Sequence, residues 1–127
     1  MGLVLAGALA LPAVAFATDP GEQLYLRHCG SCHGPKGRGD GIAAPFITPR
    51  PPDLTAIAQR NEGVFPYASV LMKLDGRERV PAHGSREMPI WGERFGESIP
   101  ESSLSEEVTR GRVVTLVEYL KSIQRRN

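Results

Sequence analysis

The segment Cys29-Gly30-Ser31-Cys32-His33 decides how this chain of 127 residues is interpreted. It contains both cysteines of the chain, separated by two residues. On one helical turn, residues i, i+3 and i+4 share a face, so this spacing places two thiols and an imidazole toward the same side. Two cysteines so close in sequence cannot cross-link distant parts of a small fold, which excludes a disulfide-stabilised scaffold.

The C-x-x-C-H spacing is the pattern of covalent c-type haem attachment. Cys29 and Cys32 would each add to a vinyl group of one haem c, and His33 would lie beneath the iron as an axial ligand. The alternatives are a thioredoxin-like dithiol and half of a zinc site. The dithiol needs a βαβ context, which the sequence lacks. Zinc needs four ligands, and the only further histidines are His28 and His83.

Upstream of the motif, residues 3–16 form an apolar run that ends in Ala15-Phe16-Ala17, an A-x-A cleavage pattern. We expect residues 1–17 to be a cleaved signal peptide and residues 18–127 to be one exported, periplasmic domain. The run departs from the pattern in one respect, since no Lys or Arg precedes it. An uncleaved anchor or a buried helix is the alternative. The run is, however, shorter than the ~20 residues of a membrane span, and it contains Pro12.

Composition limits the remaining function classes. Lys and Arg number 15 and Asp and Glu 14, for a net charge of +1, so nothing favours nucleic-acid binding. Beyond the leader the chain is poor in core-forming residues, and it holds most of the 14 Gly and 11 Pro. We therefore expect a group other than side chains to fill part of the interior.

The remaining sequence predicts helices joined by long loops. Helices are expected at residues 20–32, 54–61 and 67–74, and a last one begins near Ser102 or Ser103. Glycines and prolines make residues 34–53 and 77–100 loops. No strand pattern is present, so the predicted fold is all-α, with about four short helices and long loops wrapping one covalently attached haem. The cations Arg125 and Arg126 lie where a helix dipole favours positive charge, which requires no partner.

With these features the chain resembles the class I cytochromes c, small monohaem electron-transfer proteins, over most of residues 18–127. The resemblance rests on Gly21 and Tyr25 in the first helix, the C-x-x-C-H motif followed by Gly34, the pair Met88-Pro89, and Tyr119-Leu120 in the closing helix. It implies an all-α fold in which the first and last helices cross, with Gly21 and Tyr25 against Leu116, Tyr119 and Leu120.

A low-spin electron carrier needs a second axial ligand, for which we favour Met88. It lies in the second loop and is followed by Pro89, so its side chain can reach the distal haem face. Met72 lies in a predicted helix among apolar neighbours, where a core position is expected. His28 adjoins Cys29 and cannot easily reach the opposite face. His83 or an open site remain alternatives, and His/Met ligation raises the reduction potential.

Four further residues are candidates for contacts around the haem. A ligating His donates its other N–H to a backbone carbonyl, and the resemblance suggests the carbonyl of Pro45. Trp91, Arg50 and Arg86 are candidate donors to the haem propionates. For Trp91 the alternative is core packing, and for the two arginines it is a solvated loop position.

These features predict a periplasmic one-electron carrier, not an enzyme, that exchanges electrons with redox protein partners as a monomer or as a complex subunit. The near-neutral charge predicts only a modest dependence of association on ionic strength. The alternative is the haem subunit of a periplasmic dehydrogenase or terminal oxidase. A haem-based sensor or peroxidase would need an open sixth site, against which the presence of Met88 argues.

Overall fold

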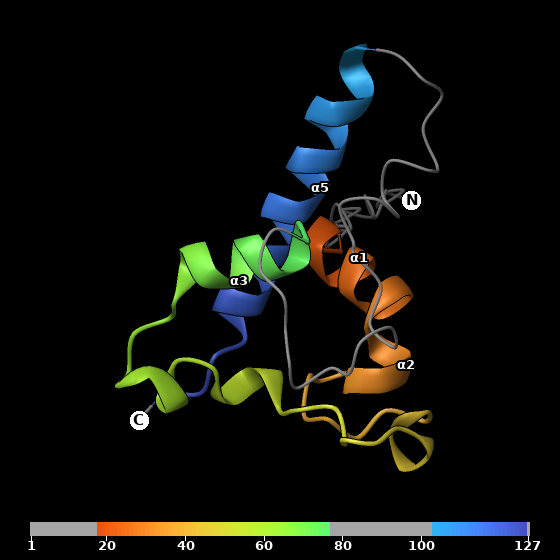
Figure 1. Ribbon diagram of the computed structural model, residues 1–127, viewed down its shortest axis with the longest axis vertical. Coiled ribbons are helices and arrows are strands. Elements are labelled where there is room, and N and C mark those ends of the chain that lie inside the picture. The colour runs from red at the N-terminus through yellow and green to blue at the C-terminus, as the bar shows by residue number, and fades with distance from the viewer. Residues whose placement is uncertain (1–17, 77–102, 127) are drawn as a thin grey trace, which may run out of the picture.

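The computed structural model describes residues 18–76 and 103–126, and this part of the chain contains helices and no strands (Figure 1). The α-helices are α1 (Pro20–His28), α2 (Gly30–His33), α3 (Tyr67–Leu74) and α5 (Ser103–Ser122). Three short 3-10 turns lie between them: η1 (Ala44–Phe46), η2 (Leu54–Ala56) and η3 (Gln59–Asn61). The all-α prediction is confirmed.

Helix α1 begins as the sequence predicts, because Asp19 caps it. The Asp19 carboxylate accepts the N–H groups of Gly21 at 2.6 Å and Glu22 at 3.2 Å, and Pro20 occupies the first helical position. The expected continuous helix over residues 20–32 is wrong. The helix is interrupted at Cys29, whose φ of −118° departs from the ideal helical value, so the residues that follow form the separate turn α2.

The later elements lie where the sequence predicts them, but one of them is a different kind of helix. The helix expected at residues 54–61 is instead the pair of 3-10 turns η2 and η3. Helix α3 has the predicted bounds, and Gly76, at φ 80°, follows it in the left-handed conformation that ends a helix. Helix α5 begins at Ser103, as expected.

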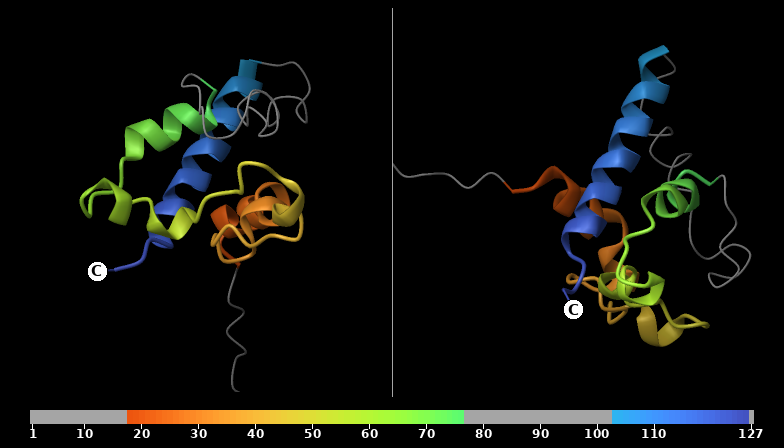
Figure 2. Two further views of the ribbon diagram at one scale, coloured as in Figure 1. Left: turned by 60° about the horizontal axis from the view of Figure 1, so that its bottom comes forward. Right: turned by 90° about the vertical axis from the view of Figure 1, so that its left-hand side faces the viewer.

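The core lies where α1 and α3 pack on α5 (Figures 1 and 2). Tyr25 of α1 and Leu116 of α5 are both 0% exposed, and the rings of Tyr25 and Tyr119 lie 5.3 Å apart. A Cβ on Gly21 would lie 2.6 Å from Cβ of Tyr119, so only glycine permits this approach. The crossing of the first and last helices is therefore as the resemblance implied.

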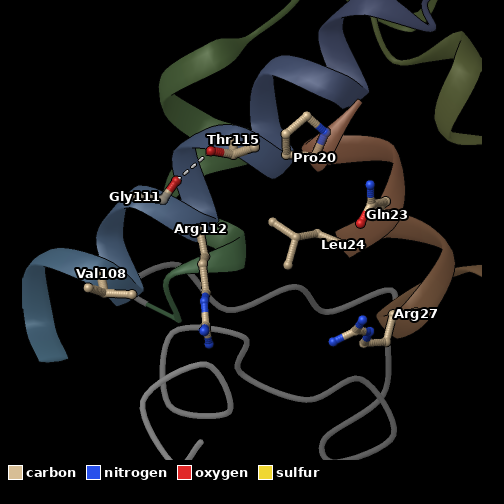
Figure 3. A pocket seen from close by; sticks show the side chains of 8 residues that line it. All are labelled: Pro20, Gln23, Leu24, Arg27, Val108, Gly111, Arg112 and Thr115. Atoms are coloured by element: carbon tan, nitrogen blue, oxygen red, sulfur yellow. Dashed lines mark hydrogen bonds between the residues drawn. The ribbon is translucent and has the colours of Figure 1, made fainter. Parts of the chain in front are cut away.

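Beside this crossing, a groove of about 420 Å³ separates α1 from α5 (Figure 3). Leu24 and Arg27 line it from α1, and Val108 and Arg112 from α5. The Thr115 hydroxyl on its wall donates to the carbonyl of Gly111 at 2.9 Å. In the part of the chain that the structure describes, no helix has the length and apolarity needed to cross a membrane.

Candidate haem-binding site

The single turn α2 and its N-cap residue Cys29 hold the two thiols and the imidazole of the motif. Its backbone is fixed by N–H groups of Cys32 and His33, which donate to the carbonyl of Cys29 at 3.2 and 2.9 Å. The two cysteines form no disulfide, and Cys29 is buried while Cys32 is half-buried. Burial, followed by the nearby Cys32, raises the pKa of the Cys29 thiol to about 12. The motif thus presents two thiols one turn apart, and burial keeps that of Cys29 protonated.

His33 is buried, with 5% of its surface exposed, and its ring is oriented by the backbone. Its Nδ1–H donates to the carbonyl of Pro52 at 3.1 Å. A carbonyl can only accept, so Nδ1 carries the proton and Nε2 is left with the lone pair that a metal requires. This is the arrangement that orients ligating histidines in metal sites.

The prediction that Pro45 supplies this carbonyl is wrong, because the loop after the motif folds back on α2. The N–H groups of Gly39 and Gly41 donate to the carbonyls of His33 and Cys32 at 2.8 and 3.2 Å. These bonds leave Pro45 exposed on η1. The Leu54 N–H then donates to the Gly37 carbonyl at 2.6 Å, which brings the preceding Pro52 to the imidazole.

Pro52 was missed because Pro45 was expected from the family resemblance. The available signal is the run of prolines that ends directly before Asp53, since Asp53 caps η2 by accepting the Thr55 N–H at 2.8 Å. Prolines before a capped turn stay extended and keep their carbonyls accessible.

The same loop is tied to α1 through a buried hydrogen bond. The Tyr25 hydroxyl donates to the carbonyl of Gly34 at 2.6 Å. Burial, and after it the thiol of Cys29, raises the pKa of Tyr25, so the hydroxyl stays protonated and keeps this bond. Gly34 itself has φ 81°, which an L side chain rarely adopts. The chain can therefore turn directly after the histidine.

Of the candidate propionate donors, Arg50 lies within the described residues. It is exposed, and its Nε–H donates to the Gly39 carbonyl at 3.3 Å. This contact anchors the side chain on the loop that follows the motif and leaves its terminal nitrogens for another acceptor. Met88, Trp91 and Arg86, together with the alternative ligand His83, lie outside the described residues.

The expectation that Met72 is a core residue is wrong. On α3, Val70 and Leu74 are buried against α5, while Met72 is 42% exposed. Successive helical residues rotate by about 100°, so a residue two positions from each of these faces away from the core. Met72 is thus a surface methionine of α3.

The residues present fit a haem. The donor set is two thiols and one imidazole whose Nδ1 is turned to a backbone carbonyl, which suits covalent attachment with axial ligation through Nε2. Next to α2, Ile42 and Phe46 are 86% and 88% exposed, and the Ala43 N–H between them donates to the Ser31 carbonyl at 2.9 Å. Large apolar side chains held beside the motif are suited to a flat apolar cofactor.

A zinc site finds no support in the same region. Among residues 18–76 and 103–126, no three His, Cys, Asp or Glu side chains are grouped so as to hold a metal ion. The motif, the buried histidine and the all-α frame together define a c-type haem protein.

Comparison with known families agrees with this class. The family model described as Cytochrome c matches residues 18–124, and the chain belongs to that family. No curated protein and no solved structure matches the chain significantly. Membership identifies the protein as a class I c-type cytochrome with haem c bound covalently through Cys29 and Cys32, and haem-based electron transfer as the family's function.

Proposed function

We propose that this protein is a periplasmic one-electron carrier in which His33 and Met88 are the axial ligands of the haem iron. In this proposal residues 1–17 direct export and are removed, and the mature domain exchanges single electrons with a donor and an acceptor protein. Trp91, Arg50 and Arg86 are the proposed donors to the haem propionates.

The observation that carries the proposal is the state of His33. Its ring is buried, directly follows two thiols on one turn, and is oriented by the Pro52 carbonyl at 3.1 Å. A ring held in this way presents Nε2 in one fixed direction, so ligation requires no rearrangement of the chain.

When bound, the haem supplies an iron that cycles between the ferrous and ferric states. The protein's part is to keep the ligand geometry constant. The hydrogen bonds from His33 to Pro52 and from Tyr25 to Gly34 join α1, the motif and the following loop into one unit. Such a unit favours rapid electron exchange, because little needs to move.

The ligand assignment is tested with the weak near-infrared charge-transfer band of a Met sulfur–iron bond in the ferric protein. The wild type is expected to show the band and Met88→Ala to lose it. Met72→Ala is the matched control and is expected to keep it, because Met72 is a surface residue of α3. A band that is absent from the wild type, or that disappears with Met72 instead, overturns the assignment.

The export proposal has its own measurement. Periplasmic extract of cells expressing the full chain is expected to contain haem-bearing protein whose first residue is Thr18. Haem-bearing protein that retains residues 1–17 and sediments with membranes would show that the leader is an anchor.

A further inference from the structure

A second groove, of about 510 Å³, lies at the C-terminal end of α5, between that end and the segment of η3. In Figure 1 this end of α5 lies at the lower left, and the Cys-His turn α2 at the lower right. Three cations line the groove, namely Lys121, Arg125 and Arg126. Its lining within the described residues includes no carboxylate, and it has an apolar part at Ala58 and Phe65.

A rigid hydrogen-bond network forms the base of this groove. The Gln124 side chain accepts the Ala58 N–H at 2.9 Å and donates to the carbonyls of Leu54 and Leu120 at 2.8 and 2.6 Å. The Arg125 N–H donates to the Thr55 carbonyl at 2.9 Å. The backbone that bears the cations is therefore fixed before any partner binds, which lowers the entropic cost of binding.

The three cations differ in whether they interact with another group of the described residues. Arg125 pairs with Asp53 at 2.9 Å, and Lys121 lies 5.9 Å above the ring of Tyr67. Arg126 is exposed and has no hydrogen bond or ion pair to the described residues. The side-chain carboxylates nearest in sequence to the groove are the exposed Glu62 and Glu118. Glu118 is the hydrogen-bond partner of Tyr67.

A helix dipole does not account for this arrangement. It favours cations in the last turn of α5, which ends at Ser122 and contains Lys121. Arg125 and Arg126 follow the helix, in the segment that packs on η2. A fourth cation, Arg60 of η3, lies beside the pair of Arg125 and Asp53, since it donates to the Asp53 carbonyl at 2.9 Å.

We propose that the groove at the end of α5 is a docking site for an acidic segment of a partner protein. Carboxylates of that segment would pair with Lys121 and Arg126, and an apolar side chain would cover Phe65. The concave shape and the apolar part favour a protruding polypeptide over a flat anionic lipid surface. The proposal rests on the proposed function only in taking the partner to be a protein, since binding here requires no electron transfer.

The test uses the full mature protein with its haem, kept ferric, and the probe peptide acetyl-Glu-Glu-Leu-Glu-Glu-amide. At an ionic strength of about 0.1 M, where the screening length is about 10 Å, the peptide is expected to shift the amide NMR signals of Gln59, Gly63 and Ser122. Arg126→Glu is expected to raise the dissociation constant roughly fivefold, because attraction is replaced by repulsion at an exposed site.

Arg110→Glu is the matched control, since it makes the same charge change on an exposed residue near the other end of α5. It is expected to leave the dissociation constant within about twofold of the wild type. An equal loss in both variants would mean a net-charge effect and would overturn the proposal, as would an absence of peptide binding. Binding to phosphatidylglycerol vesicles without peptide binding would also overturn it, in favour of a membrane surface. Because the docking test measures peptide binding and does not involve the axial ligands, its failure leaves the His33 and Met88 assignment unaffected.

Discussion

Tyr25 is the residue on which core and site most directly depend. Its side chain is 0% exposed, its ring lies 5.3 Å from that of Tyr119, and its hydroxyl donates to the Gly34 carbonyl at 2.6 Å. One face of α1 thus packs on α5 while the tip of the same side chain holds the chain that leaves the haem-binding turn. A substitution of Tyr25 would therefore affect both the stability of the fold and the geometry of the haem-binding turn.

We expect Tyr25→Phe to destabilise the ferric protein by about 1–2 kcal/mol, because the buried Gly34 carbonyl loses its donor while the ring packing is kept. Denaturant unfolding followed by haem absorbance measures this loss. Tyr67→Phe is the control, since Tyr67 is only half-buried and its Glu118 partner is exposed. Equal losses in the two variants would contradict a special role for the bond to Gly34.

Asp53 gives the stability a predictable dependence on pH. Burial alone raises the pKa of Asp53, but hydrogen bonds from Thr55 and the charges of Arg125 and Arg60 outweigh it, so the folded pKa lies below the ordinary value. The unfolded chain therefore takes up the proton first. The stabilisation is present above pH about 3.9, the ordinary value for Asp, and is lost as the pH falls through the folded pKa.

Accordingly, wild type should be more stable than Asp53→Asn at pH 6, and the difference should shrink as the pH falls below about 4. Urea unfolding of both proteins over this pH range measures the difference. A gap that stays constant down to pH about 2.5 would show that the Asp53 charge does not contribute.

At the scale of elements, the crossing of α1 and α5 depends on the absence of a side chain at Gly21. A Cβ there would lie 2.6 Å from Cβ of Tyr119 and 2.8 Å from the Thr115 carbonyl oxygen. Both contacts are to groups fixed within α5, so the two helices themselves would have to separate. The loss of stability would then come from the whole buried interface of the two helices and not from one contact.

Gly21→Ala is expected to destabilise the protein by about 1–3 kcal/mol, the usual range for overpacking. Gly111→Ala is the control on the opposing helix, because a Cβ there has no heavy atom within 4 Å. It is expected to stabilise the protein by about 0.5–1 kcal/mol through helix propensity. Thermal unfolding of the two variants tests the pair, and a stable Gly21→Ala protein would contradict the close approach.

At the scale of the whole molecule, the main apolar cluster of the described residues lies at the contact of α1, α3 and α5. In the loop that contains η1, Ile42 and Phe46 are both more than 80% exposed. Backbone hydrogen bonds to α2 hold this loop in place. A domain this small with so limited a core is marginal without its cofactor. Haem binding should therefore contribute much of the folding free energy.

A Cys29→Ala/Cys32→Ala variant should release its haem to acidified organic solvent, and the haem-free chain should unfold without a cooperative transition. Circular dichroism on heating measures this, with the wild-type holoprotein as the reference. A sharp, native-like transition in the haem-free variant would show that side chains alone suffice for the core.

Local signals in the sequence predicted most of the helices. Asp19 with Pro20 fixed the start of α1, and Gly76 fixed the end of α3, because caps and glycine stops act over one turn. The break at Cys29 and the 3-10 geometry of η2 and η3 were missed. Both arise where a segment packs around the motif and the end of α5, and such packing overrides local propensity.

The sequence by itself determined the all-α class, the family and the attachment residues Cys29 and Cys32, because the spacing of donors on one turn is a local property. Only the tertiary structure decided that Pro52 rather than Pro45 orients His33, and that Met72 faces outward. It also brought Lys121 and Arg126 around the groove beside η3. These facts depend on how a glycine-rich loop folds back and on which helix face meets α5, which are long-range contacts that no local pattern encodes.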